Sequence, residues 1–354
     1  MGRTVIPVTM KTIATELGVS ITTVSNAYSK PDRLSAELRE QVFAKAEALG
    51  YCGPSAAGRA LRSGRTDVCG FYLGSHLAFA FSDPYTVILL SGIGETLEEF
   101  GSSVLLLHAS PDGESEVLQR AAVDAVVAAM PFEPHPGLGM LRRRGVPVVG
   151  THRGSEGDWV AINDAKAGRL VGKHLARLGH SRIVVIVPGT LPAGREVLDV
   201  ELAPGGAWPV GFPGVRVGYA AERVRGLQET LPGASIRLVC AGQNIKESGR
   251  RAGAHVLDDQ HRPTAIVALS DVLAIGVWDA VRERGLTPGR DVSITGFDDL
   301  PDAGFLGLTT VSQPIAEKGR LAARLAMDPD YPDRQVLLPV ELKVRASTGP
   351  APLN

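Results

Sequence analysis

The sequence predicts an α/β protein in which a small three-helix unit precedes two subdomains built on parallel sheets. Helical periodicity and a glycine-containing turn dominate residues 10–50. From Val68 onward, short apolar runs alternate with helical stretches in two successive series. Near-continuous apolar strands separated by helices are typical of parallel sheets that are covered on both faces. The chain has 354 residues, 44% of them hydrophobic, which is enough for more than one buried core.

The first 52 residues predict a helix-turn-helix domain. Residues 10–17 have a helical pattern, and Gly18 can adopt the positive φ of a tight turn. Ser20 can cap a second helix, whose Val24 then packs back on Ile13 of the first helix. A third helix follows the cap Ser35 and ends at residue 50. The second helix of such a unit can enter the major groove of DNA.

The charge distribution agrees weakly with a DNA-binding head. The whole chain has a formal net charge of −1, whereas residues 1–65 hold nine lysines and arginines against five acidic residues. A basic head on an acidic body suits contact with a polyanion.

Residues 53–67 are predicted to be a hinge. The segment begins at Gly53, and Gly64 lies near its end, with mostly helix-forming residues from 55 to 62 between them. A helix this short is unstable unaided, so we expect it to form only when the segment is docked.

The remainder predicts two similar subdomains with a ligand cleft between them, because ligands bind outside the carboxyl ends of parallel strands. The connection 188–217 is rich in proline and glycine, and we expect a long loop that could carry a hairpin. The predicted strands are 68–73, 103–107, 123–128, 146–150, 159–162, 183–187, 236–240, 264–269 and 292–297. The predicted helices between them include 85–100, 164–178, 218–231, 245–257 and 272–285.

Several classes of protein are disfavoured by what the sequence lacks. Cys52, Cys69 and Cys240 have no metal or redox spacing and are read as small buried hydrophobes. No stretch approaches the ~20 apolar residues of a membrane helix, and residues 1–4 do not resemble a secretory leader. We therefore expect a cytoplasmic protein with no metal, no cofactor and no membrane partner.

Ordered motifs along nearly the whole chain resemble the LacI/GalR family of bacterial repressors. The motifs are residues 9–14, 18–20 and 23–25 in the head, 49–51 and 54–61 around the hinge, and 178–183, 265–268, 270–271, 274–276, 296–299, 308–311 and 344–348 in the body.

The resemblance implies a homodimer that binds a near-palindromic DNA operator and responds to a small effector. Its core would be of the periplasmic-binding-protein-like kind, and the effector a sugar or a nucleoside-like molecule. We expect a headpiece at 1–52, a hinge at 53–67, an N-terminal core subdomain at 68–162 and 312–333, a C-terminal core subdomain at 163–311 and 334–348, and a tail at 349–354.

Ile21, Thr22 and Asn26 lie where members of the family read bases. Asn26 can bond adenine N6 and N7, and Ile21 can touch a thymine methyl group; otherwise these residues form a solvated helix face. Many relatives have arginine at position 26, so their guanine preference is not transferred. Phosphate contacts, or simple capping, are expected for the remaining polar residues of the head, which are Thr9, Ser20, Thr23, Ser25 and Tyr51.

Leu61 occupies the position of the hinge leucine that is inserted into a base step, and Arg59 could follow the minor groove. Ordinary helix packing is the alternative for Leu61. Gly58 stands where relatives have alanine, which should weaken the hinge helix by up to ~1 kcal/mol.

The effector candidates follow from the same resemblance. Arg223 begins an Arg-x-x-Gly motif whose arginine binds effector in relatives, and Asp298 follows a strand and could accept hydroxyls. Ser270 and Asp271 could serve the ligand or cap a helix. His152 and Asn244 depart from the family pattern, and the absence of an aromatic residue at 244 disfavours a typical hexose. The full set is Tyr85, His152, Arg153, Arg223, Asn244, Ser270, Asp271 and Asp298.

Two alternatives to a repressor are a solute-binding transport receptor and an enzyme. A solute-binding transport receptor has the same two-lobed body, but it needs export and has no use for the head. An enzyme is disfavoured, and no catalytic residue is assigned, because no glycine-rich phosphate loop follows the first strand and adjacent residues such as Asp298 and Asp299 generally point apart. The sequence therefore predicts an effector-controlled transcriptional repressor.

Overall fold

The computed structural model describes residues 8–108, 116–129, 135–154, 157–203, 205–209, 212 and 218–352. Residues 1–4, on which the expectation about a leader rests, lie outside this range, as does most of 210–217. The chain divides into two compact units, Met1–Thr66 and Asp67–Asn354, which are described separately.

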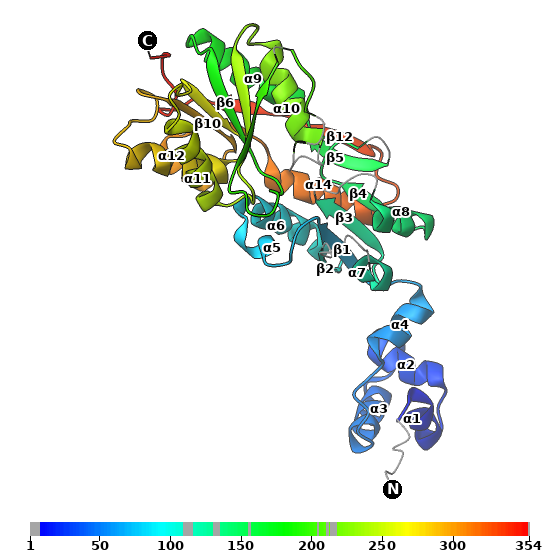
Figure 1. Ribbon diagram of the computed structural model, residues 1–354. Helices are drawn as coiled ribbons and strands as arrows, with labels where there is room; N and C mark the ends of the chain where they lie inside the picture. The colour runs from blue at the N-terminus through cyan, green and yellow to red at the C-terminus, as the bar shows by residue number, and fades with distance from the viewer. Residues whose placement is uncertain are drawn as a thin grey trace. The chain divides into compact units, whose positions relative to one another are not determined.

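The first unit contains the predicted helix-turn-helix. Three buried pairs form its core: Ile13 and Ala14, Val24 and Ala27, and Val42 and Ala46. Gly18 makes the turn with φ 65°. Its elements are α1 (Met10–Leu17), α2 (Ile21–Ser29), the 3₁₀ turn Pro31–Arg33, α3 (Ala36–Ala48) and α4 (Ala56–Ser63) (Figure 1).

The hinge segment contains helix α4, at the helix-forming stretch that the sequence predicted, and the dependence of this helix on docking stays a prediction. Both ends of α4 are capped, which compensates for its eight residues. The Ser55 hydroxyl accepts a hydrogen bond from the Gly58 amide, and Gly64 ends the helix with φ 70°.

The second unit contains two sheets, as predicted. The first sheet is entirely parallel, with α6 and α14 packed on one face and α7 and α8 on the other. Its strand order is β12-β5-β4-β3-β1-β2. Its strands are β1 (Val68–Leu73), β2 (Ser103–His108), β3 (Ala125–Ala129), β4 (Val148–Gly150), β5 (Asp158–Ile162) and β12 (Gln335–Leu338). Its helices are α5 (Phe79–Ser82), α6 (Pro84–Glu99), α7 (Glu116–Arg120), α8 (Pro136–Arg143) and α14 (Ile315–Met327).

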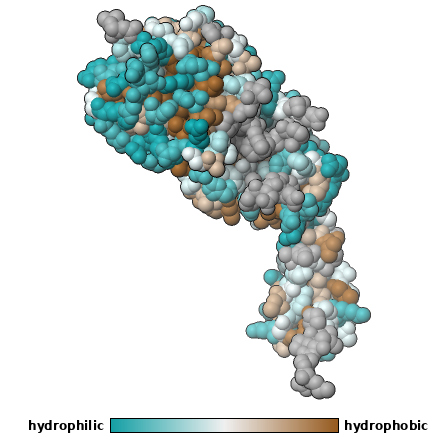
Figure 2. All heavy atoms as spheres, viewed as in Figure 1, coloured by the Kyte–Doolittle hydropathy of each residue, from teal (hydrophilic) through white to brown (hydrophobic). Residues whose placement is uncertain are grey.

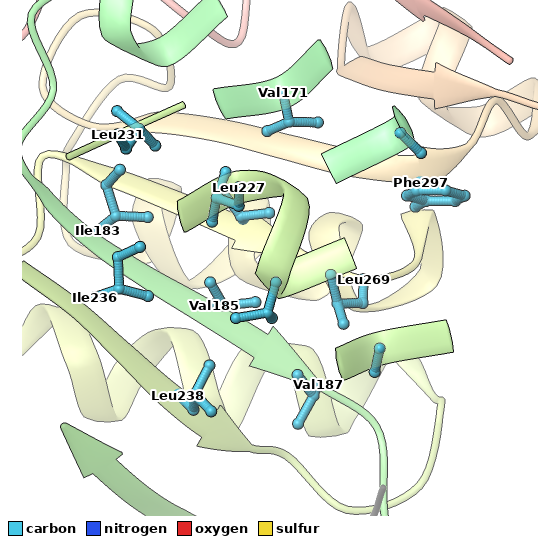
Figure 3. Close-up of a cluster of buried hydrophobic side chains, with 14 of the residues drawn as sticks. Val171, Ile183, Val185, Val187, Leu227, Leu231, Ile236, Leu238, Leu269 and Phe297 are labelled. Carbon is cyan, nitrogen blue, oxygen red and sulfur yellow. The ribbon is translucent and has the colours of Figure 1, made fainter. Parts of the chain in front are cut away.

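The second sheet has α9 and α10 on one face and α11 and α12 on the other. Figure 3 shows the first of these cores, where Val171 and Leu227 face Val185. The strand order is β13-β11-β10-β9-β6-β8-β7, with antiparallel strands at both edges. Its strands are β6 (Arg182–Val187), β7 (Leu198–Leu202), β8 (Ser235–Cys240), β9 (Ala265–Ala268), β10 (Ser293–Asp298), β11 (Thr309–Ser312) and β13 (Glu341–Lys343). Its helices are α9 (Asp164–Arg177), α10 (Gly218–Glu229), α11 (Lys246–Leu257), α12 (Asp271–Glu283) and α13 (Pro301–Leu306).

The structure differs from two expectations about the core. Strand β12 belongs to the first sheet, although residues 334–348 were assigned to the second subdomain. It pairs in parallel with β5, where Val336 lies opposite Val160, and so covers the open edge of that sheet. The described part of 188–217 holds one strand, β7, antiparallel to β8, rather than a hairpin.

Helices α9 and α10 approach closely at two glycines, and this contact positions part of the cleft. A Cβ on Gly226 would lie 2.0 Å from the carbonyl oxygen of Ala165, and one on Gly168 would lie 1.9 Å from that of Arg223. Because neither residue has a side chain, the first turn of α9 lies beside the middle of α10.

Helices α11 and α12 cover one face of the second sheet. Hydrophilic residues dominate the visible face around α11 and α12 (Figure 2). In the described part of the chain, no helix is both long and apolar enough to cross a membrane.

Candidate functional site

The exposed side of α2 carries the predicted base-reading residues. Val24 and Ala27 point into the core, which leaves Ile21 and Thr22 exposed and Asn26 partly exposed. Ile21 is 49% exposed, which leaves its side chain accessible for contact with a base edge.

Several of the predicted phosphate-contacting residues make hydrogen bonds or ring contacts within the head. The Ser20 hydroxyl accepts a hydrogen bond from the Thr23 amide at 3.0 Å, and Thr9 caps α1 by accepting from Thr12. These capping contacts fix both helix starts and still leave Thr9 and Ser20 exposed. The Tyr51 ring packs edge-on against Tyr28 at 6.1 Å between ring centroids, while Ser25 is partly buried.

The hinge helix presents Leu61 and Arg59 to solvent. Leu61 is 88% exposed, so packing within the described part of the chain does not account for an apolar residue there.

A cavity of about 330 Å³ lies between the two core subdomains, at the carboxyl ends of their strands. Six of the eight predicted effector residues line it: Tyr85, His152, Arg223, Asn244, Ser270 and Asp298. Further lining residues are Gly74, Ser75, His76, Phe79, Asp83, Pro188, Gly189, Thr190, Tyr219, Gly242, Gln243, Leu269 and Gln313.

Arg223 is a buried cation held in a fixed orientation. Its Nε donates to Asp164 Oδ1 at 2.8 Å, and one terminal nitrogen donates to the Leu269 carbonyl at 3.0 Å. The guanidinium carbon lies 3.4 Å from the ring centroid of Phe297 and 4.5 Å from that of Tyr219. A guanidinium has five N–H donors, so others remain for a ligand.

Asp298 ends β10 with its backbone at φ 118°, a conformation that non-glycine residues rarely adopt. Gln313 Nε2 donates to its Oδ1 at 2.7 Å. Burial, followed by the nearby Asp271 carboxylate, raises the pKa of Asp298 well above its ordinary value, while Arg223 opposes the rise. The strained backbone therefore aims a carboxyl group into the cavity.

Two contacts join the subdomains across the cleft. Asn244 of the second subdomain donates to Asp83 of the first at 3.3 Å, and its amide oxygen accepts from Ser270 at 2.5 Å. On the other side, the rings of His152 and Tyr219 lie 5.3 Å apart. Burial, with help from the Lys318 and Arg223 charges, lowers the pKa of His152 well below its ordinary value, so this ring is neutral at pH 7.

Asp271 and Arg153 do not line the cavity. Asp271 is fully buried and accepts hydrogen bonds from the Leu300 amide at 2.7 Å and from the Thr310 hydroxyl at 2.6 Å. These bonds tie α12 to β11 and to the loop that follows β10, and burial raises the pKa of Asp271 to about 7. Arg153 is exposed. Ser270 both lines the cavity and caps α12 through the Leu273 amide.

Sequence reasoning missed Asp83, Tyr219, Gln313 and Lys318. Lys318 is the least expected, since it is only 2% exposed. Burial lowers the pKa of its ammonium to about 8. A lysine among the apolar positions of α14 is a signal that could have drawn attention to it. Among the described residues, no cluster of histidine, cysteine, aspartate or glutamate is arranged to hold a metal ion.

Comparison with known proteins identifies both units. Residues 9–53 match the bacterial regulatory proteins of the lacI family. Residues 75–195 match the periplasmic binding proteins and sugar binding domain of the LacI family, and residues 173–348 match a periplasmic binding protein-like domain.

Whole-chain comparisons agree. An HTH-type transcriptional regulator of Mycolicibacterium smegmatis is 33% identical over 97% of both chains. The structure of a LacI family transcriptional regulator from Enterococcus faecium with bound ribose is 26% identical, covering 80% of this chain and 99% of that one, with a TM-score of 0.64. The lac repressor dimer bound to operator shares the fold with a TM-score of 0.72 at 22% identity, over 97% of this chain and 99% of that one.

The fold and the sites define a transcriptional regulator with a DNA-binding head and a ligand-binding core. A transport receptor would have no such head, so that alternative has no support. The chain belongs to the LacI family of bacterial regulatory proteins.

Proposed function

We propose that the chain acts in the cytoplasm, without catalysis, as a homodimeric repressor that releases or binds a near-palindromic operator according to a small effector. The observation that carries the proposal is a cavity with polar side chains from both core subdomains, in a chain whose head exposes Ile21 and whose hinge exposes Leu61. A ligand in this cavity bonds both subdomains at once and so favours one relative orientation of them.

On the DNA side, Ile21, Thr22 and Asn26 would read bases in the major groove. Their position on the open face of α2 supports this role. Arg59 and Leu61 would enter the minor groove, where an apolar wedge offsets the cost of unstacking by bending the duplex.

On the effector side, the cavity favours a small sugar or a nucleoside-like molecule with several hydroxyl groups. Arg223 supplies donors, Asp298 supplies an acceptor, and the aromatic rings of Tyr85 and Tyr219 can cover apolar faces. Its volume is at the lower end of the range for small-molecule sites. The ribose-bound E. faecium regulator supports a pentose as the first compound to test.

The proposal is tested by measuring operator binding in the presence of candidate effectors. DNA fragments enriched from genomic DNA are titrated with the protein by fluorescence anisotropy, at two salt concentrations and with ribose, other pentoses, nucleosides and purines. We expect salt-sensitive binding to a specific sequence and a change in affinity with one ligand class. Absence of specific DNA binding would refute the proposal that the chain is a DNA-binding regulator.

Asp298→Ala provides the matched test of the cavity. It should retain operator binding and lose the response to the effector, because it removes a cavity acceptor and leaves the head unchanged. Arg153→Ala is the control, since Arg153 is exposed and outside the cavity. If the effector changes the operator affinity of Asp298→Ala as it does that of the wild type, the effector does not bind through Asp298 in this cavity.

A further inference from the structure

A chain of hydrogen bonds behind the cavity joins residues of both subdomains. Lys318 Nζ donates to Gln313 Oε1 at 2.7 Å and to the Tyr85 hydroxyl oxygen at 3.2 Å. Gln313 Nε2 then donates to Asp298 Oδ1 at 2.7 Å. Tyr85, Gln313 and Asp298 line the cavity, whereas Lys318 lies behind them.

The direction of these bonds follows from the chemistry of the ammonium group. A protonated lysine has three donors and no acceptor. Gln313 must therefore turn its oxygen toward Lys318, which leaves its amide nitrogen facing Asp298. Tyr85 must likewise accept through its phenol oxygen, so its own hydrogen points elsewhere.

We propose that Lys318 sets the hydrogen-bond polarity of the effector site, so that Tyr85 donates to the ligand and Asp298 accepts from it. Lys318 acts through its two neighbours and is a positioning residue. The proposal rests on the proposed function, since it assumes that this cavity binds the effector.

The polarity defines the chemistry of the ligand more narrowly than the cavity walls do. The atom facing Tyr85 must accept a hydrogen bond, and the group facing Asp298 must donate one. A hydroxyl group meets either requirement, whereas a carbonyl or carboxylate oxygen facing the ionised form of Asp298 would meet an acceptor. The site therefore selects polyhydroxylated compounds over keto and carboxylate analogues of the same size.

The charges around Lys318 are consistent with an ammonium at neutral pH. The carboxylates of Asp164 and Asp298 favour the charged form, while burial and the Arg223 guanidinium oppose it. Burial lowers the pKa of the nearby His152 well below its ordinary value, so this imidazole adds no positive charge at pH 7. A leucine or methionine would fill the same space without burying a charge, so packing alone does not explain a lysine here.

The test uses the full-length protein without effector or DNA. Its side-chain amides are labelled with ¹⁵N-glutamine, and the Gln313 signal is assigned by its loss in Gln313→Leu. In the wild type we expect slow exchange of the Gln313 amide protons with solvent, and a Gln313 signal that shifts as Asp298 titrates. In Lys318→Met the amide oxygen of Gln313 loses its donor and the amide is held by Asp298 alone, so its protons should exchange at least about tenfold faster.

Lys166→Met is the matched control, since Lys166 is exposed on α9, and it should behave as the wild type. Wild-type exchange rates of the Gln313 amide protons in Lys318→Met would overturn the proposal. If that variant does not fold, the wild type provides the test: loss of the ammonium proton near pH 8 should move the Gln313 signal, and a flat profile there contradicts the proposal. Because neither effector nor operator is used, failure here is distinct from failure of the proposed function.

Discussion

Replacing Leu61 with alanine should weaken operator binding without destabilising the free protein. Leu61 is 88% exposed, so its removal leaves no cavity and removes little buried area from the free chain. If each hinge leucine is buried on the operator, burial of each is worth about 1.5–3 kcal/mol, of which alanine retains a fraction. Two copies then lose about 2–5 kcal/mol together, or about 30- to 4,000-fold in affinity.

The assay is fluorescence anisotropy with an operator duplex and with a scrambled duplex of the same length. Non-specific affinity and the salt dependence should be unchanged, because leucine contacts no phosphate. Leu337→Ala is the matched control, since Leu337 is also an exposed leucine but lies on β12 of the core. Wild-type operator affinity in Leu61→Ala, or an equal loss on both duplexes, would refute the minor-groove role.

Three further outcomes are expected. Asn26→Ala should lose about 1–3 kcal/mol of discrimination at one base pair, seen as relaxed preference there in a binding-site selection and unchanged preference elsewhere. Asp164→Ala should lower the free energy of unfolding of the core by about 3–5 kcal/mol in urea, because it leaves the Arg223 guanidinium buried without its carboxylate; Asp164→Asn should lose less, and equal losses would contradict the charge argument. Burial lowers the pKa of Lys318 to about 8 from its ordinary 10.5, so the folded protein binds fewer protons than the unfolded chain between these values. The wild type should therefore gain up to about 3 kcal/mol of stability relative to Lys318→Met as pH rises from 8 to 10.5, and parallel pH profiles would contradict this.

Local sequence patterns predicted most of the helices and strands, because the residues within an element largely determine its type and its bounds. Strand β1 was predicted at residues 68–73 and is observed there, since an apolar run bounded by polar residues defines it. Strand β12 could not be assigned to its sheet in this way. Its partner β5 lies more than 170 residues earlier, and β12 alone fits the edge of either sheet.

The cleft residues likewise divide into those that a sequence motif predicted and those that no motif predicted. Arg223 and Asp298 belong to motifs and line the cavity, although their contact with an effector stays a prediction. Asp83 and Lys318 belong to no motif, and their hydrogen bonds to Asn244 and Tyr85, which are distant in the sequence, were not predictable. Ser270 and Asp271 are adjacent, yet only the first lines the cavity, because successive side chains of a helix point in different directions.

The path of the backbone between the two core subdomains has a mechanical consequence. The backbone passes between the subdomains three times, from β5 to α9, from β11 to α14 and from β12 to β13. A single tether would let the subdomains slide and twist freely, whereas three tethers oppose both movements and leave bending as the least restricted one. Ligands of different shape should then drive the same path of closure, so that their chemistry alters how far the equilibrium moves rather than the form of the signal delivered to DNA.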